Sequence, residues 1–205
     1  MKKILSVKEI RRIEAKEFKK RGNSFSLMVD AGHNCAKTIT KFIKKKPVTV
    51  ICGPGNNGGD GFILSEYLRK KKFRIKVFCL KKKHYKGDAL TALKKLKIKT
   101  KDISNFKADD NSLIIDCLFG IGISRKISGD LKKIVFKINK SKQKIISIDI
   151  PSGIHGDTGK IMGCAVKANV TLALHTKKIG HTLNPGKKYC GKIIVQDIKI
   201  STQFI

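Results

Sequence analysis

Three turns in the sequence combine glycine with oxygen-bearing side chains, and each directly follows a short apolar run. The first covers residues 53–61 and contains five glycines, two asparagines and Asp60. The second covers residues 116–122, and the third, residues 149–153, precedes an Asp-Thr-Gly at residues 157–159. Each turn alone fits a plain strand-ending connection. Three together indicate one shared ligand pocket, because glycine lets backbone amides approach a ligand closely.

The side chains of these turns suggest two kinds of chemistry. Asn57, Asp116 and Ser152 offer oxygen atoms with a single negative charge, which suits a weakly bound monovalent cation better than calcium. Asp149 ends an apolar run and is then the best candidate for acid–base chemistry. Lys178 is a candidate electrostatic partner for Asp149, although any single lysine among 40 is first expected at the surface.

The glycine-rich turn is typical of anion binding at a helix N-terminus, with the spacing G-x-G-x-x-G at Gly53, Gly55 and Gly58. A dinucleotide fingerprint also needs an acidic residue about 20 positions later to bind a ribose hydroxyl. Residues 67–87 contain no Asp or Glu, and no Gly-Lys-Ser/Thr follows the loop. The sequence therefore argues against an ordinary NAD-dependent dehydrogenase and against a Walker-type phosphate loop.

Short apolar runs alternate with amphipathic stretches from residue 47 onward. Strands are expected at residues 48–52, 73–80, 112–118, 144–150, 169–175 and 192–198, and helices at 59–71, 88–96 and 130–138. This alternation predicts an α/β fold of the Rossmann-like, doubly wound type: a mainly parallel sheet with helices on both faces, in three layers. In such a sheet ligands bind beyond the carboxyl ends of the strands, where the three turns lie.

Two helices are expected before the sheet. Ser6 and Glu9 form a capping-box pattern that starts a helix toward Phe18. Met28, Ala31, Cys35, Ile39 and Phe42 then mark one face of a second helix. We therefore expect a single domain over residues 1–205, with a helical preamble at 1–46 and a Rossmann-like core at 47–205.

The net charge of +31 is the most unusual feature of the composition, with 46 basic and only 15 acidic residues. Only six of the basic residues are arginine, the preferred residue for forked phosphate and guanine contacts, so a lysine-biased surface is favoured over nucleic-acid binding. The six cysteines form no C-x-x-C pair and are expected to be buried and reduced. Without a signal peptide or membrane-spanning stretch, a cytoplasmic protein is expected.

Taken together, these motifs resemble those of the YjeF N-terminal domain family. These are the NAD(P)H-hydrate (NAD(P)HX) epimerases, which include the mammalian apolipoprotein A-I binding protein. Residues 27–32 resemble the family's L-M-E-N-A-G helix, residues 55–61 its glycine loop, and residues 116–122 its D-A-L-F-G-T-G turn. Residues 149–153 and 157–159 resemble its third motif, and residues 178–197 its closing segment. The departures are Val29 and Asp30, Ile121, and residues 198–200.

The resemblance implies an isomerase that interconverts the R and S forms of NADHX or NADPHX, and it assigns roles by position. Asp149 is implied as the catalytic residue, and Asn57, Asp116 and Ser152 as ligands of one potassium ion per subunit. The implied contacts to the substrate are Asn56, Asn57, Gly58, Gly59, Asp60, Gly120, Ile121, Gly122, Ile123, Ser124, Arg125, Lys126 and Asp149.

Partners follow from the same resemblance. A homodimer is expected, and a separate NAD(P)HX dehydratase would complete the repair unless this chain is a fragment of a bifunctional enzyme. The main alternative is a non-catalytic module of the same fold that binds nucleotide, RNA or protein. The high charge favours that alternative, whereas the acids and glycines retained in all three motifs oppose it. An NADP-dependent dehydrogenase is disfavoured because no hydride-transfer acid or metal site accompanies the loop.

Overall fold

A parallel sheet forms the centre of the protein in a computed structural model that describes residues 3–43, 46–108 and 111–201. Within these residues the main sheet has seven strands in the order β4-β3-β2-β5-β6-β7-β9, and every neighbouring pair is parallel. The strands are β2 (Val48–Cys52), β3 (Ile75–Cys79), β4 (Lys101–Asp102), β5 (Leu113–Cys117), β6 (Ile145–Ile148), β7 (Val170–Leu174) and β9 (Lys192–Gln196). All six expected strands are confirmed, and the two-residue β4 is an addition.

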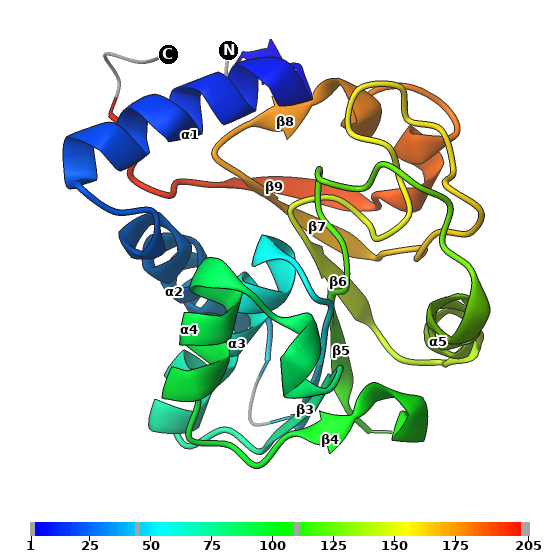
Figure 1. The fold of residues 1–205 in the computed structure, drawn as a ribbon. Helices are drawn as coiled ribbons and strands as arrows, with labels where there is room; N and C mark the ends of the chain where they lie inside the picture. Colours follow the sequence, from blue (N-terminus) through cyan, green and yellow to red (C-terminus); the bar gives the residue numbers. More distant parts are fainter. Residues whose placement is uncertain (1–2, 44–45, 109–110, 202–205) are drawn as a thin grey trace.

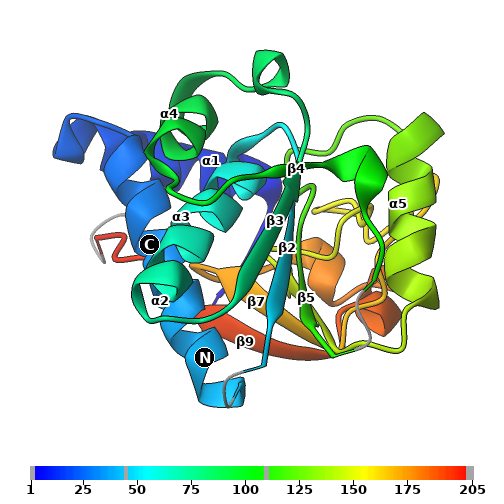
Figure 2. The same cartoon turned by 90° about the horizontal axis from the view of Figure 1, so that it is seen from below.

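Helices cover both faces of this sheet, as Figure 2 shows most clearly. On one face lie α2 (Phe25–Phe42), α3 (Asn56–Lys70) and α4 (Gly87–Lys95), and on the other lies α5 (Gly129–Lys140). Each face has its own hydrophobic cluster, one containing Val50 and Phe62 and the other Ile51 and Ile134. The three-layer, Rossmann-like fold class is therefore confirmed.

The second of the helices expected at residues 1–46 packs into the same hydrophobic core as the sheet. Cys35 and Ile39 of α2 are fully buried in the same cluster as strands β2 and β5, so α2 belongs to a helical layer of the sheet. Residues 1–2 and 44–45 of the expected preamble, and 109–110 and 202–205 of the expected core, lie outside the described residues.

The first helix, α1 (Val7–Arg21), is fixed beside the carboxyl end of the sheet (Figure 1). The predicted capping box is present, with the Ser6 hydroxyl accepting from the Glu9 amide. Just before it, β1 (Ile4–Leu5) pairs in parallel with β8 (Lys177–Lys178), and the Val7 amide donates to Asp157 Oδ1 at 2.7 Å. These contacts join the start of the chain to segments more than 140 residues away, which sequence periodicity does not reveal.

The cysteines agree with the expectation from the sequence. All six cysteines are buried and free of disulfide bonds. Among the described residues, no helix is both long enough and apolar enough to cross a membrane.

The junction between β2 and β5 depends on Gly53, where the order of strands reverses. A Cβ atom at Gly53 would lie 1.8 Å from the Leu118 carbonyl oxygen, whereas one at Gly55 would meet nothing within 4 Å. We predict that Gly53→Ala lowers the free energy of unfolding by about 2 kcal/mol or more, because backbone atoms must move apart. Gly55→Ala is the matched control and is expected to cost under about 1 kcal/mol. Equal midpoints for the two variants in urea denaturation would contradict the predicted clash between a side chain at position 53 and the Leu118 carbonyl group.

Candidate active site

A cavity of about 900 Å³ opens at the carboxyl ends of β2, β5 and β6, where the sequence places its three turns. Most of the predicted substrate-binding residues line it: Asn56, Asn57, Asp60, Gly120, Ile121, Gly122, Ile123, Ser124, Arg125, Lys126 and Asp149. This edge is also where the strand order reverses between β2 and β5, the usual ligand position in doubly wound sheets.

Gly58 and Gly59 do not line the cavity but shape the loop beneath it. A Cβ atom at Gly58 would lie 1.9 Å from the Gly53 carbonyl oxygen, and one at Gly59 would lie 2.6 Å from the Met28 side chain. These two glycines therefore let the N-terminus of α3 turn tightly and pack against α2. Glycine is needed at these two positions because a side chain would clash with neighbouring atoms, more than because a ligand contacts them.

Asp116 and Ser152 are fully buried and are not among the lining residues, but they bond to the backbone of Leu118 and Phe119, which line the cavity. The Asp116 carboxylate accepts hydrogen bonds from the Ser147 hydroxyl at 2.8 Å, the Ser152 amide at 3.0 Å and the Leu118 amide at 3.2 Å. The Ser152 hydroxyl also donates to Asp116 and accepts from the Phe119 amide at 2.9 Å. Burial raises the pKa of Asp116, and the Ser152 hydrogen bonds oppose that rise. This network joins the second and third turns.

Asn57 is the unsatisfied member of the predicted cation-binding set. Its side chain is only 7 % exposed, yet neither its amide oxygen nor its amide nitrogen has a hydrogen-bond partner among the described residues. A buried amide without partners costs free energy unless a ligand supplies the missing contacts. The position therefore calls for a polar or ionic ligand at the base of the cavity.

Asp149 holds an unusual backbone conformation directly after β6. Its φ angle is +70°, a left-handed value that non-glycine residues rarely adopt. The imidazole of His181 stabilises it: the Lys178 amide donates to Nδ1 at 2.8 Å, so Nε2 carries the proton and donates to the Asp149 carbonyl at 3.0 Å. Burial, and next the charge of Lys178, lower the pKa of His181 to about 4 and keep the ring neutral.

The Asp149 carboxylate faces the cavity between two fixed contacts. Oδ1 pairs with the Lys178 ammonium, which is 1 % exposed and also donates to the Leu174 carbonyl at 2.8 Å. Oδ2 accepts from the Ile121 amide at 2.9 Å. A Cβ atom at Gly120 would lie 2.6 Å from Oδ2, so glycine at this position leaves room for the carboxylate. The expectation that Lys178 is the electrostatic partner of Asp149 is confirmed.

Glu14 and Arg11 also line this cavity, and the sequence patterns did not single them out. Both lie on α1, and Glu14 is half-buried. Burial, and next the negative charge of Asp149, raise the pKa of Glu14 to about 7, while Lys178 and Arg11 act in the opposite direction. One signal existed in the sequence: Glu14 falls four residues after the buried Ile10 and seven after Val7, on the apolar face of its helix.

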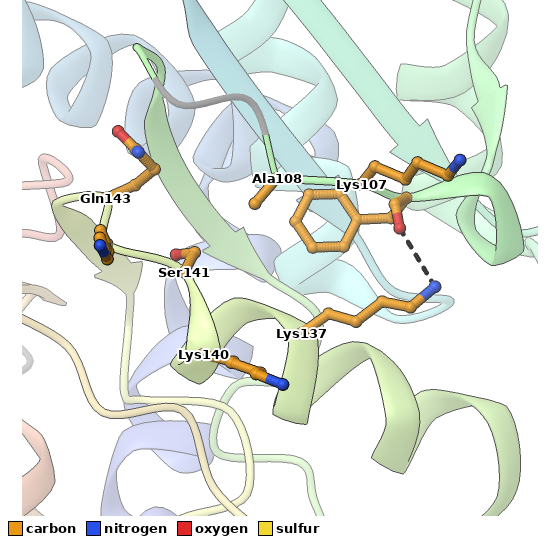
Figure 3. A pocket seen from close by; sticks show the side chains of 8 residues that line it. Lys107, Ala108, Lys137, Lys140, Ser141 and Gln143 are labelled. Carbon is orange, nitrogen blue, oxygen red and sulfur yellow. Dashed lines mark hydrogen bonds between the residues drawn. The ribbon is translucent and has the colours of Figure 1, made fainter.

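A second cavity, of about 630 Å³, lies at the amino ends of β5 and β6 (Figure 3). Its described lining includes Lys107, Lys137, Lys140 and Lys142 and shows no carboxylate among those residues, and the Lys137 ammonium donates to the Phe106 carbonyl at 3.2 Å. The other edge of the sheet carries the glycine-rich turns together with Asp149 and Lys178, so we place the candidate active site there.

The described residues thus define a Rossmann-like α/β domain whose polar cavity lies at the reversal of strand order. The chain belongs to the family described as YjeF-related protein N-terminus, which matches residues 24–180.

Similar proteins in bacteria include both short and long chains. An NAD(P)H-hydrate epimerase of Lentilactobacillus buchneri is 34 % identical over 98 % of this chain and 96 % of its own length. A bifunctional NAD(P)H-hydrate repair enzyme Nnr of Dictyoglomus turgidum is 36 % identical over 99 % of this chain. The present chain matches only 41 % of that longer protein.

Among solved structures, the crystal structure of yeast ynu0 is similar, with a TM-score of 0.73 and 25 % sequence identity. The similarity covers 88 % of this chain and 83 % of the yeast chain. The likeness supports the doubly wound fold described above.

We predict that Asp149→Asn lowers the pKa of Glu14 from about 7, because it removes a nearby negative charge that disfavours the ionised carboxyl. The measurement is a pH titration of the Glu14 side-chain carboxyl signal by carbon-13 NMR. Asp130→Asn is the control, since Asp130 is exposed on α5 and should leave the titration unchanged. A Glu14 pKa that did not respond to Asp149→Asn would disprove this electrostatic coupling.

Proposed function

We propose that this chain is an NAD(P)HX epimerase, which interconverts the R and S forms of hydrated NADH and NADPH. The observation that carries the proposal is the Asp149–Lys178 pair at the wall of a cavity formed by all three sequence motifs. The relatives named NAD(P)H-hydrate epimerase match nearly the whole chain, which supports the same activity. A cavity of about 900 Å³ is also large enough for a nucleotide-sized ligand.

In this proposal the first turn, at residues 53–61, and the segment at residues 120–126 bind the dinucleotide. Gly55 is the N-cap of α3, so the first turn of this helix lies within residues 53–61 and its backbone amides are free to bind an anion. Arg125 and Lys126 also line the cavity and add positive charge to it. Amides and cations of this kind favour the phosphates, and the remaining lining residues orient the hydrated ring.

Inversion at carbon 6 requires that the hydroxyl leaves and returns on the opposite face, or that the ring opens. The ring nitrogen's lone pair assists departure, and a carboxyl group must move a proton to and from oxygen. The contacts of Asp149 support this role, because Lys178 and the Ile121 amide hold its carboxylate in one orientation. Positioning by fixed neighbours is what makes such a proton transfer efficient.

Potassium is the proposed resident ion, held by Asn57, Asp116 and Ser152. These residues fit it: all offer oxygen, they carry one negative charge together, and the Asn57 amide is buried without a partner in the part of the chain that the structure describes. Among the described residues no group of three or more His, Cys, Asp or Glu side chains is suited to a metal. A bound ion would order the three turns and offset negative charge near the phosphates.

The proposed partners follow from the relatives. The Dictyoglomus turgidum protein is named a bifunctional repair enzyme, so we propose functional coupling of this chain to an NAD(P)HX dehydratase activity. A homodimer and a location in the cytoplasm remain part of the proposal. The lysine-rich surface would attract an anionic dinucleotide without requiring nucleic acid as a partner.

The decisive experiment supplies purified protein with R-NADHX in potassium buffer and follows the S form by chromatography. We expect turnover above the uncatalysed rate, and we expect Asp149→Asn to reduce kcat by about 100-fold or more. Asp130→Asn, an exposed carboxylate on α5, should retain full activity. Absence of turnover in the wild-type protein would instead favour a non-catalytic binding module, and full activity of Asp149→Asn would remove Asp149 from the mechanism.

The potassium site is tested by thermal unfolding in potassium chloride and in choline chloride at equal ionic strength. An ion at ten times its Kd stabilises the folded state by about 1.4 kcal/mol, so Tm should be higher in potassium. Asn57→Ala should abolish this difference, whereas Asn56→Ala, at the exposed neighbouring position, should preserve it. The same potassium effect in both variants would argue that the ion binds elsewhere.

A further inference from the structure

We propose that Glu14 of α1 is the second acid–base residue of the epimerisation and serves the face of the nicotinamide ring opposite Asp149. This inference rests on the proposed function. Its structural basis is the placement of the two carboxyl groups, because Asp149 reaches the cavity from the end of β6 whereas Glu14 reaches it from the helix that covers that edge. A ring bound between them would present one face to each group.

The position of α1 is determined firmly enough to hold Glu14 in place. At its start, β1 pairs with β8, the strand that contains Lys178, and the Val7 amide donates to Asp157. At its end, Arg21 bridges Glu17 of the same helix at 2.6 Å and Asp30 of α2 at 2.8 Å. A helix fixed at both ends presents the side chain in its middle at a defined depth in the cavity.

The Glu14 carboxyl group lines the cavity and is not occupied by contacts within the described protein. Across the described part of the chain, no donor forms a hydrogen bond or ion pair with it. The charged groups that influence it come from several elements: Asp149 after β6, Lys178 of β8, Arg11 of α1 itself and Asp60 of α3. The negative charge of Asp149 favours the protonated form of Glu14, whereas Lys178 and Arg11 oppose it.

Asp60 is the other carboxyl group in the cavity, and it suits the role less well. It is only 7 % exposed, and burial followed by the charges of Asp149 and Glu14 raises its pKa well above the usual range. A group that holds its proton tightly is a poor exchanger at neutral pH. Glu14 has a pKa of about 7, where an acid can both give up and regain a proton.

The proposed step balances without any oxidant or cofactor. For one epimer, Glu14 protonates the hydroxyl at carbon 6, the carbon–oxygen bond breaks, and the ring-nitrogen lone pair forms a carbon–nitrogen double bond as water leaves. Water then adds on the opposite face, Asp149 takes its proton, and the electron pair returns to nitrogen. One water is released and one is consumed, and one proton passes from Glu14 to Asp149. The reverse reaction exchanges the two roles, and before a second turnover in the same direction the proton returns from Asp149 to Glu14 through solvent.

The test compares inversion with oxygen exchange in Glu14→Gln, using R- and S-NADHX in water enriched in oxygen-18. Inversion is followed by chromatography and label uptake by mass spectrometry, each corrected for the rate without protein. We expect inversion to fall about 100-fold while one epimer still exchanges its oxygen, because Asp149 continues to serve its own face. Glu14→Asp should recover part of the inversion rate.

Two controls separate this proposal from a structural role of Glu14. Arg12→Gln removes a charge from an exposed position of the same helix and should leave inversion unchanged. Since the folded state binds the Glu14 proton more tightly than the unfolded state does, stability falls as pH rises from about 4.5 to about 7. Glu14→Gln should therefore raise Tm more at pH 8 than at pH 5, which shows that the variant folds.

The outcomes separate the two proposals. Wild-type protein that inverts NADHX while Glu14→Gln stays within about threefold of it overturns the role of Glu14 and leaves the epimerase function standing. Loss of inversion and of exchange from both epimers to the same extent also overturns it, because a residue serving one face cannot affect both equally. A wild-type protein without any inversion overturns the proposed function itself.

Discussion

The buried ion pair between Asp149 and Lys178 is the interaction on which the site depends. Both partners are nearly inaccessible to solvent, and removing one partner of such a pair typically costs about 3–5 kcal/mol because the other charge is left buried and uncompensated. The pair also unites distant parts of the chain, since Asp149 follows β6 and Lys178 belongs to β8. Through β8 it reaches β1, and through β1 it sets the start of α1.

Two uncharged neighbours, His181 and Gly120, help to position the ion pair. His181 remains neutral, accepts from the Lys178 amide and donates to the Asp149 carbonyl, so it links the backbones of both partners. Glycine at position 120 leaves space for the carboxylate. The left-handed φ of Asp149 therefore persists because several contacts determine it together, as is common at functional sites.

Beneath this pair, the Asp116 network unites the second and third turns around a single buried carboxylate. Because hydroxyls and amides satisfy its oxygens, the negative charge can stay buried, and Asn57 remains the one predicted ligand in need of contacts. One departure from the family pattern, Ile121, lines the cavity. Another, Asp30, lies on α2 and pairs with basic residues of α1 and of the segment after β9, so it ties both to α2.

The sequence by itself determined the layers of the fold and the side of the sheet that carries the site. Short apolar runs alternate with amphipathic stretches. Strands that are buried on both faces are continuous apolar runs, which can be recognised from the sequence alone. The glycine turns could be placed at one edge because parallel strands all end there. The roles of Gly58 and Gly59 were harder to infer, since packing and ligand contact both select glycine.

Only the tertiary structure decided which charges meet. Nothing local distinguishes Lys178 from 39 other lysines, because its burial depends on the pairing of β1 with β8. Glu14 likewise looks like one acid on an amphipathic helix until α1 is placed over the cavity. Electrostatic partners are set by distances in space, and those distances follow from long-range contacts that no spacing along the chain encodes.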